Sequence, residues 1–320
     1  MHTSWLTAEQ YARLSNQVQG AYLCPLPGFE VLRVNGADNR SFLQGQTTCD
    51  LNQLTDDRFL RGAHCDVKGK MWSIFHLCAA EDALLLVAHR EELQASVPQW
   101  KKFGVFAKVS FDDSQQVVFG LGGEQATQLA AELGFSIPAN DGGLSRSAAG
   151  CLLRLAQDHH LLIVPRQLAD SWLTADYPLA APPLWLRRHI QLGFSYLEQP
   201  LCGQLVPQML NLQALDAISF TKGCYIGQET VARLKYRGGN KRAAFILCAD
   251  SDEQPAAGAE LELKLEQHWR RIGQVINAVN INNQLWLIAV LPNDITPADT
   301  LRLAADTEVT LSLQPLPYAI

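Results

Sequence analysis

The chain has 320 residues, of which 48% are hydrophobic and 18% are charged, and its formal net charge is −6. This composition is typical of a folded globular protein and excludes a largely disordered one, while the length predicts two or three domains. A general nucleic-acid-binding protein is usually basic overall, so any RNA contact of this acidic chain has to be local or indirect.

The first 110 residues are expected to form an α+β domain. Residues 29–34 alternate apolar and polar side chains, as a half-buried strand does, and Asp38 is placed to cap a short helix. The pattern then predicts a hairpin, a further strand and an amphipathic helix: strands at 61–66 and 71–78 around a turn at 68–70, a strand at 83–89 and a helix at 91–103.

Residues 111–239 repeat this mixture and are expected to form a second α+β domain. The expected strands lie at 117–120, 151–155, 161–164 and 217–219, and the expected helices at 124–133, 166–173 and 184–192.

The last eighty residues change character, and we place a domain boundary near residue 239. Short strands separated by turn residues predict a β-barrel over 240–320. These strands are expected at 243–248, 260–265, 272–280, 285–290 and 308–313.

Cysteine usage and the absence of targeting patterns both bear on the cellular compartment. The N-terminal residues do not read as a signal peptide and no apolar run is long enough to span a bilayer, so we expect a cytoplasmic protein. The eight cysteines are scattered and none forms a Cys-x-x-Cys pair. This spacing predicts reduced thiols, without structural zinc or a protein-bound iron–sulfur cluster.

Residues 220–229 read Phe-Thr-Lys-Gly-Cys-Tyr-Ile-Gly-Gln-Glu and carry the most chemical character. A helix is expected to follow, which would put Cys224 on a glycine-flanked turn near a helix N-terminus. The positive helix end and the nearby Lys222 both favour a thiolate over a thiol. Gly223 and Gly227 would let the backbone approach a ligand closely. The alternative is a tight connection around a buried, inert cysteine.

Five cations follow this stretch within ten residues: Arg233, Lys235, Arg237, Lys241 and Arg242. They would suit an anionic partner such as tRNA or a glutamate tail. They would equally suit a solvated helix face whose charges complement the helix dipole. The sequence leaves both interpretations open.

Residues 222–229 resemble the signature of the YgfZ family, the folate-binding relatives of the T-protein of glycine cleavage. Further stretches carry the same resemblance: residues 35–38 with 44–46, 64–66 with 68–72, 207–215, 237–242 and 315–318. The resemblance therefore extends over nearly the whole chain.

The resemblance implies three domains in a cloverleaf around a central hole that binds tetrahydrofolate or a one-carbon derivative. It also implies an accessory protein for iron–sulfur enzymes, above all a radical enzyme that methylthiolates tRNA, with a link to control of the replication initiator. Cys224 would be a functional thiol tuned by Lys222. The other motif residues would shape the turn, cap the helix or orient the ligand: Gly223, Tyr225, Gly227, Gln228 and Glu229.

Two aromatic residues are implied to contact folate, namely Phe29 and Trp185. The family carries tryptophan at the first of these places, and Phe29 can stack on a pterin ring but lacks the indole donor. Trp185, taken alone, would also suit a core position, because large aromatic side chains anchor cores.

A departure from the aminomethyltransferases concerns the reaction class. Those enzymes carry a carboxylate where the strand after the glycine turn begins, whereas residues 71–75 here contain no acid. Neither Ser73 nor Ile74 can act as a general base at neutral pH, so we expect no glycine-cleavage activity. Two alternatives stay open: a folate-dependent transferase or demethylase with Cys224 as nucleophile, and an interaction module whose basic run docks tRNA or a client.

Overall fold

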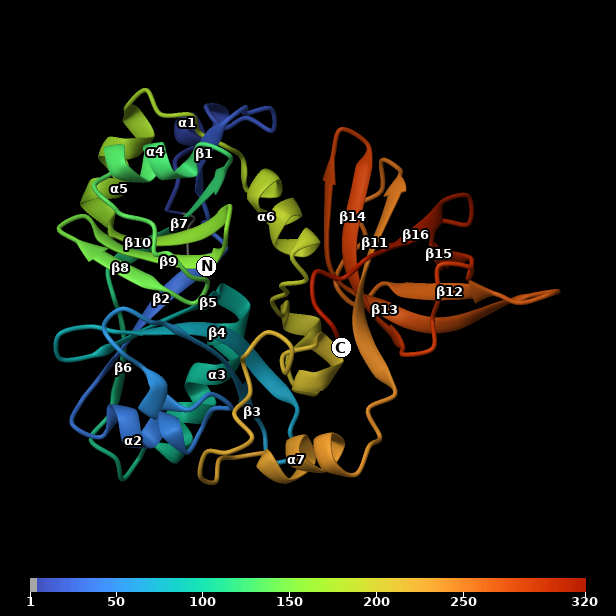
Figure 1. The fold of residues 1–320 in the computed structure, drawn as a ribbon, viewed down its shortest axis with the longest axis horizontal. Coiled ribbons are helices and arrows are strands. Elements are labelled where there is room, and N and C mark those ends of the chain that lie inside the picture. Colours follow the sequence, from blue (N-terminus) through green and yellow to red (C-terminus); the bar gives the residue numbers. More distant parts are fainter. Residues whose placement is uncertain (1–4) are drawn as a thin grey trace.

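The computed structural model describes residues 5–320, which form three lobes (Figure 1). Two α+β lobes lie one above the other, and a closed β-barrel lies beside them. The predicted α+β class with a C-terminal barrel is therefore confirmed. Among residues 5–320, no helix has the length and apolar character that a membrane-spanning helix requires.

The first lobe is a five-stranded antiparallel sheet with helices α2 (Asn39–Gln44) and α3 (Arg90–Phe103). Its strands, in order across the sheet, are β3 (Leu60–Cys65), β4 (Met71–Ala79), β5 (Leu84–His89), β2 (Phe29–Asn35) and β6 (Ser110–Asp113). The predicted hairpin at 68–70 joins β3 to β4. Asp38 precedes α2 as predicted, but its carboxylate accepts from the backbone N–H of Lys108 and caps nothing.

The second lobe is also a five-stranded antiparallel sheet, with helices α4 (Ala126–Glu132) and α5 (Arg166–Thr174). Its strands, in order across the sheet, are β1 (Ala21–Pro25), β7 (Gln116–Gly123), β10 (His159–Pro165), β9 (Gly150–Ala156) and β8 (Leu144–Ser147). The short helix α1 (Ala8–Ala12) precedes β1.

The chain does not pass from lobe to lobe in a simple succession. β1 lies within the predicted first domain, 1–110, yet it pairs with β7 in the second lobe. β6 extends past residue 110 and pairs with β2 in the first lobe. The sequence pattern shows that a segment is a strand, but not which neighbour offers it hydrogen bonds.

The barrel consists of six strands in the order β11 (Arg242–Asp250), β14 (Gln284–Pro292), β13 (Trp269–Ile281), β12 (Glu260–Lys264), β15 (Leu301–Leu303) and β16 (Thr310–Gln314). Buried residues alternate with half-buried or exposed ones along β12 and β15. Closing the sheet removes the exposed edges that an open sheet of this size would present.

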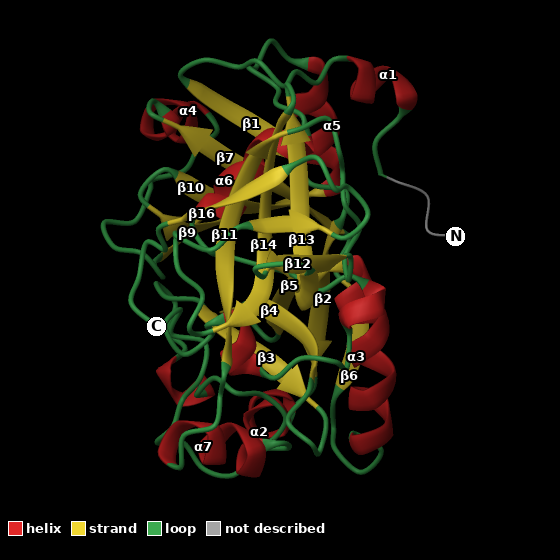
Figure 2. Cartoon of the chain, turned by 90° about the vertical axis from the view of Figure 1, so that its right-hand side faces the viewer, coloured by secondary structure: helices red, strands yellow, loops and turns green. Residues whose placement is uncertain are grey.

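The segment between the second lobe and the barrel runs past all three lobes (Figure 1). It begins with α6 (Pro182–Gln191) and ends with α7 (Gln228–Tyr236), and between them lie the 3-10 turns η2 (Gln199–Leu201) and η3 (Pro207–Leu210). Figure 1 and Figure 2 show α7 and α2 both at the lower end of the molecule. The prediction of a strand at 217–219 is wrong. This stretch is irregular and is held instead by Thr48, whose hydroxyl donates to Ala217 O over 2.6 Å.

Candidate functional site

The motif segment packs against the β3–β4 turn of the first lobe. Gly227 has a φ of +84° and precedes α7, and a Cβ there would lie 2.5 Å from Asp66 O. Gly69 in the turn also lies close to this segment, because a Cβ on it would lie 2.9 Å from Thr230 Cβ and 3.2 Å from Gly227 O. Both glycines are therefore required by the contact between two backbone segments. Gly223, in contrast, has open space on its Cβ side.

Cys224 is exposed, so the alternative of a buried, inert cysteine does not describe this structure. The exposed Glu229 lies in the first turn of α7. The Gln228 side chain accepts a long hydrogen bond of 3.4 Å from Tyr225 N rather than capping the helix. The thiol therefore lies on a turn fixed from both sides, in front of a helix N-terminus.

Lys222 is 8% exposed, and its ammonium group donates to three backbone carbonyls. The acceptors are Gln44 O, Thr47 O and Cys49 O, at 2.7, 2.8 and 2.6 Å. Burial lowers the pKa of Lys222 to about 8. Because these carbonyls take up all three N–H donors, an effect of Lys222 on Cys224 would have to act through charge and not through a direct hydrogen bond.

A cavity of about 30 Å³ lies between β3, β4 and the segment after α6. Among the described residues, Arg61 Nε, His76 Nδ1 and Ser195 Oγ are buried without a hydrogen-bond partner, and all three residues line this cavity. Burial lowers the pKa of Arg61 to about 10 and that of His76 well below its usual value. Unsatisfied buried polar groups are rare, and together they suit a polar ligand group or ordered water.

These three groups could hydrogen-bond to the polar edge of a pterin, but the cavity is too small to hold one. Ligand pockets measure roughly 300–1,000 Å³, well above the cavity of about 30 Å³. A folate bound here would have to displace the lining side chains, among them Phe194 and His189. Among the described residues, no group of three or more His, Cys, Asp or Glu side chains is arranged to hold a metal ion.

Trp185 is a core residue in this structure, with 0% of its surface exposed. Its ring stacks on His159 and His189 at centroid distances of 4.2 and 4.8 Å, and its Nε1–H donates to His160 O. The Phe29 and Trp185 rings meet in an edge-to-face arrangement with their centroids 6.0 Å apart, and Phe29 is also buried. The two residues implied to contact folate thus lie together, but neither lines the small cavity.

Replacing Trp185 by alanine is therefore expected to destabilise the protein by about 3–5 kcal/mol, since it removes a large buried side chain. Urea unfolding measures this loss. Trp185→Phe keeps most of the packing and is expected to cost less. A Trp185→Ala protein with the wild-type midpoint would show that the ring does not support the core, and only then would weaker folate binding report a direct contact.

Sequence reasoning missed Glu92, a carboxylate that is 1% exposed. Its carboxylate accepts hydrogen bonds from Ile74 N, Leu197 N and His89 N. A carboxylate from α3 thus contacts β4, the strand that has no acidic residue at 71–75. Burial raises the pKa of Glu92 to about 8, while the three N–H donors act in the opposite direction. Its place three residues after the helix cap was the available signal, because glutamate there completes a capping box.

Four of the five cations of the basic run are exposed: Arg233, Lys235, Arg237 and Lys241. Lys235 Nζ lies 4.4 Å from the centre of the Phe220 ring, and the exposed Tyr236 lies on the same helix. Arg242 differs, because its guanidinium donates to Ile272 O and Val290 O in the barrel. The exposed surface of α7 therefore combines cations with aromatic rings, next to the segment that carries Cys224.

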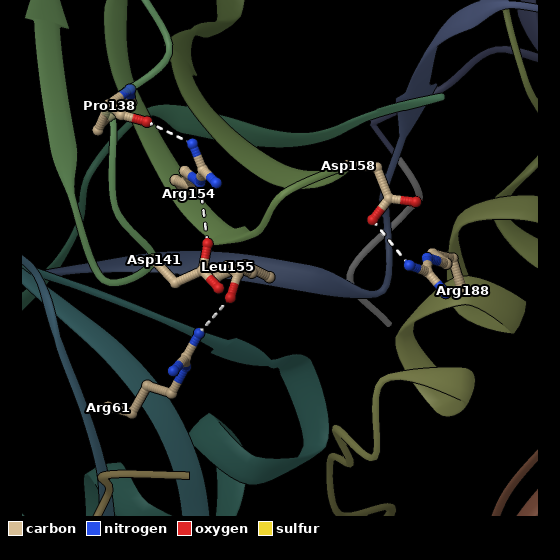
Figure 3. Close-up of polar contacts among 7 residues, drawn as sticks. All are labelled: Arg61, Pro138, Asp141, Arg154, Leu155, Asp158 and Arg188. Atoms are coloured by element: carbon tan, nitrogen blue, oxygen red, sulfur yellow. Dashed lines mark hydrogen bonds and ion pairs between the residues drawn. The ribbon is translucent and has the colours of Figure 1, made fainter. Parts of the chain in front are cut away.

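Three arginines make polar contacts within and between the elements around the second lobe (Figure 3). Arg61 on β3 donates to Leu155 O on β9 over 2.7 Å, which ties the first lobe to the second. Arg188 on α6 donates to Asp158 over 2.9 Å, and Arg154 to Asp141 over the same distance. The cavity-lining Arg61 is thus fixed at one nitrogen and unpartnered at another.

Residues 240–306 match the family model described as the β-barrel domain of YgfZ. The chain is 37% identical over 305 residues to "tRNA-modifying protein YgfZ" of Yersinia pseudotuberculosis serotype IB (strain PB1/+), which covers 93% of this chain and 92% of that one. The chain belongs to the YgfZ family. The YgfZ protein of Escherichia coli O157:H7 (strain EC4115 / EHEC) is also 37% identical over 305 residues, covering 93% of both chains.

The YgfZ fold is that of an aminomethyltransferase. A crystal structure of the glycine cleavage system aminomethyltransferase T from Bartonella henselae superposes with a TM-score of 0.72 and covers 97% of this chain and 88% of that one. The sequence identity is 15%, so the likeness concerns the fold alone.

Proposed function

We propose that this YgfZ-family chain is a cytoplasmic accessory protein that binds a reduced folate and supports tRNA modification by an iron–sulfur enzyme, such as a tRNA methylthiotransferase. The observation that carries the proposal is the exposed Cys224 on a turn fixed by Gly227 and Lys222. The relatives named as tRNA-modifying proteins and the aminomethyltransferase fold both support it.

Folate would bind at the cavity between β3, β4 and the segment after α6. Arg61, His76 and Ser195 would hold a polar group of the ligand, because each has a buried polar atom without a partner in the described chain. Bound tetrahydrofolate would supply a one-carbon carrier. The lining residues after α6 would have to move apart to admit it, since the cavity measures only about 30 Å³.

Cys224→Ala is expected to fold normally, because the side chain is exposed, and to lose the ability to restore tRNA methylthiolation in cells that lack the protein. Mass spectrometry of tRNA nucleosides measures the modification, and a thermal melt confirms the fold. Cys248→Ala, which changes a half-buried thiol on the barrel, is the matched control and should restore modification. A fully active Cys224→Ala protein would end the case for a functional thiol.

The alternative is a folate-dependent one-carbon transferase or demethylase in which Cys224 is the nucleophile, and the same exposed thiol favours it. Turnover of a folate one-carbon unit by the purified protein, lost in Cys224→Ala, would support this enzyme. Binding of tetrahydrofolate without turnover would favour the accessory protein.

The cation and aromatic surface of α7 is proposed to contact tRNA. Changing Arg233, Lys235 and Arg237 to glutamine is expected to weaken binding and to lower the slope of log K against log salt by about 0.7–0.9 for each phosphate that the variant no longer neutralises. Filter binding over a salt series measures the slope. Changing Lys264, Arg270 and Arg271 on the barrel removes the same charge and should leave the slope unchanged. Equal effects of both triple variants would contradict a specific surface.

A further inference from the structure

Two buried thiols meet where the two α+β lobes touch. Cys78 lies near the end of β4 in the first lobe, and Cys151 lies near the start of β9 in the second. Both belong to the same hydrophobic cluster, and each thiol shifts the pKa of the other. Neither residue belongs to the family motif or lines the cavity of about 30 Å³.

An arginine connects these thiols to both lobes. Arg146 on β8 is the cross-strand partner of Cys151 on β9. Its Nη1 donates to Cys151 Sγ over 3.2 Å, and its Nη2 donates to the carbonyl of Ala79, the neighbour of Cys78. A guanidinium that donates to sulfur stabilises the thiolate form.

The two sulfurs are therefore unequal. The interaction with Cys78 and the charge of Arg146 lower the pKa of Cys151 below its usual value, whereas the interaction with Cys151 and burial raise the pKa of Cys78. Cys151 is also the more accessible, with 6% of its surface exposed against 0% for Cys78. A small oxidant thus meets the more nucleophilic sulfur first.

We propose that Cys78 and Cys151 form an oxidation site for hydroperoxides, which closes into a disulfide between the two α+β lobes. The Cys151 thiolate attacks one peroxide oxygen, the O–O bond breaks, and the departing oxygen takes up a proton as water or an alcohol. Cys78 then attacks the resulting sulfenic acid, the S–O bond breaks, and hydroxide leaves with the Cys78 proton as water. Two thiols and one hydroperoxide give one disulfide, one water and one water or alcohol.

This site goes beyond the proposed role in tRNA modification. β4 carries Ile74 and His76 in the wall of the cavity, and β9 holds Arg61 through Leu155 O. A covalent bond between β4 and β9 would fix the relative placement of the elements that have to separate to admit a ligand. Oxidation would then act on the cavity without involving Cys224.

The test uses the full chain with Cys224→Ser, so that the exposed thiol forms no intermolecular disulfide. The folded protein is treated with hydrogen peroxide, blocked with N-ethylmaleimide and digested with trypsin without reduction. The sequence provides one peptide for each cysteine, because cleavage at Lys70 and Arg90 releases residues 71–90 and cleavage at Arg146 and Arg154 releases residues 147–154. We expect these two peptides to be linked, and the oxidised protein to melt several degrees higher.

Variants separate the two steps. Cys78→Ser should leave Cys151 as a sulfenic acid that dimedone traps, Cys151→Ser should leave Cys78 unoxidised, and Arg146→Gln should slow formation of the link. Cys24 and Cys65 are the internal controls, since burial raises the pKa of both thiols. The proposal is overturned if, in the folded Cys224→Ser protein, Cys151 is oxidised no faster than Cys24 and Cys65, or if the link forms only in urea.

Discussion

Lowering the pH from 7 to 5.5 is expected to remove up to about 5 kcal/mol of stability through four buried histidines, each contributing about 1.2 kcal/mol. These residues are His64, His159, His160 and His189, which are at most 4% exposed. Burial lowers the pKa of His64 and His189 to about 3 and that of His160 to about 4, and it lowers the pKa of His159 well below its usual value.

The direction follows from where the protons bind. In the unfolded chain these histidines take up a proton near pH 6.5, whereas in the folded protein they stay neutral until the pH is far lower. Below pH 6.5 the unfolded state therefore binds more protons at these four histidines, and their contribution to stability falls as the pH falls. The contacts of these rings agree with neutral histidines. Both ring nitrogens of His160 lack a partner in the described chain, so a protonated His160 would have no acceptor for its N–H groups. His159 shares one hydrogen bond with His189, and its Nδ1 lacks a partner among the described residues.

Urea unfolding between pH 5.5 and 7.5, followed by tryptophan fluorescence, measures the effect. Trp100 stacks on His64 and Trp185 stacks on His159, so the fluorescence reports on both lobes. His160→Leu should reduce the loss of stability between pH 7 and 5.5 by the contribution of one histidine, about 1.2 kcal/mol. His268→Leu changes an exposed histidine of the barrel and should leave that loss unchanged. A midpoint that stays constant from pH 7 to 5.5 would contradict the prediction.

Local patterns of the sequence predicted most of the secondary structure, because the period of apolar residues depends only on which face is buried. The hairpin at 68–70, α3 and the main barrel strands follow from such patterns. β1 and β6 could not be assigned in this way. β1 is buried throughout, and the residues of β7 with which it pairs lie roughly a hundred residues further along the chain.

The site was predictable to a smaller extent. The motif and its glycines stood out in the sequence, and the exposure of Cys224 agrees with a working thiol. The roles of Lys222 and Trp185 depend on contacts with residues far away in the sequence, namely the carbonyls after α2 and the rings of β10. No pattern in the sequence near Lys222 or Trp185 specifies such contacts. Glu92 was missed because a glutamate in the first turn of a helix is usually an ordinary capping residue, and the sequence does not show that this one is buried.

Lys222 joins the motif to the loop after α2, and its removal is expected to release that loop. Lys222→Met is expected to cost about 3–5 kcal/mol, because it leaves three carbonyls without their charged donor in a buried place. Lys222→Arg should not rescue the loss, since a planar guanidinium cannot direct three N–H groups at acceptors gathered around one nitrogen. Urea unfolding gives the stability, and limited proteolysis of residues 44–54 reports whether the loop is released.

Lys235→Met is the matched control, because it removes an exposed cation from the adjacent helix that contacts only the Phe220 ring among the described interactions. It should change the stability by no more than about 1 kcal/mol, the usual range for an exposed cation–ring contact.

The alkylation rate of Cys224 in folded Lys222→Met protein then separates the two roles of Lys222. A slower reaction than in wild type would show that the Lys222 charge favours the thiolate, as the sequence predicts. An unchanged rate, together with a large loss of stability, would make Lys222 the residue that holds the turn of Cys224 in place and nothing more. Wild-type stability in Lys222→Met would contradict the structural role, because three hydrogen bonds of 2.6–2.8 Å would then contribute nothing.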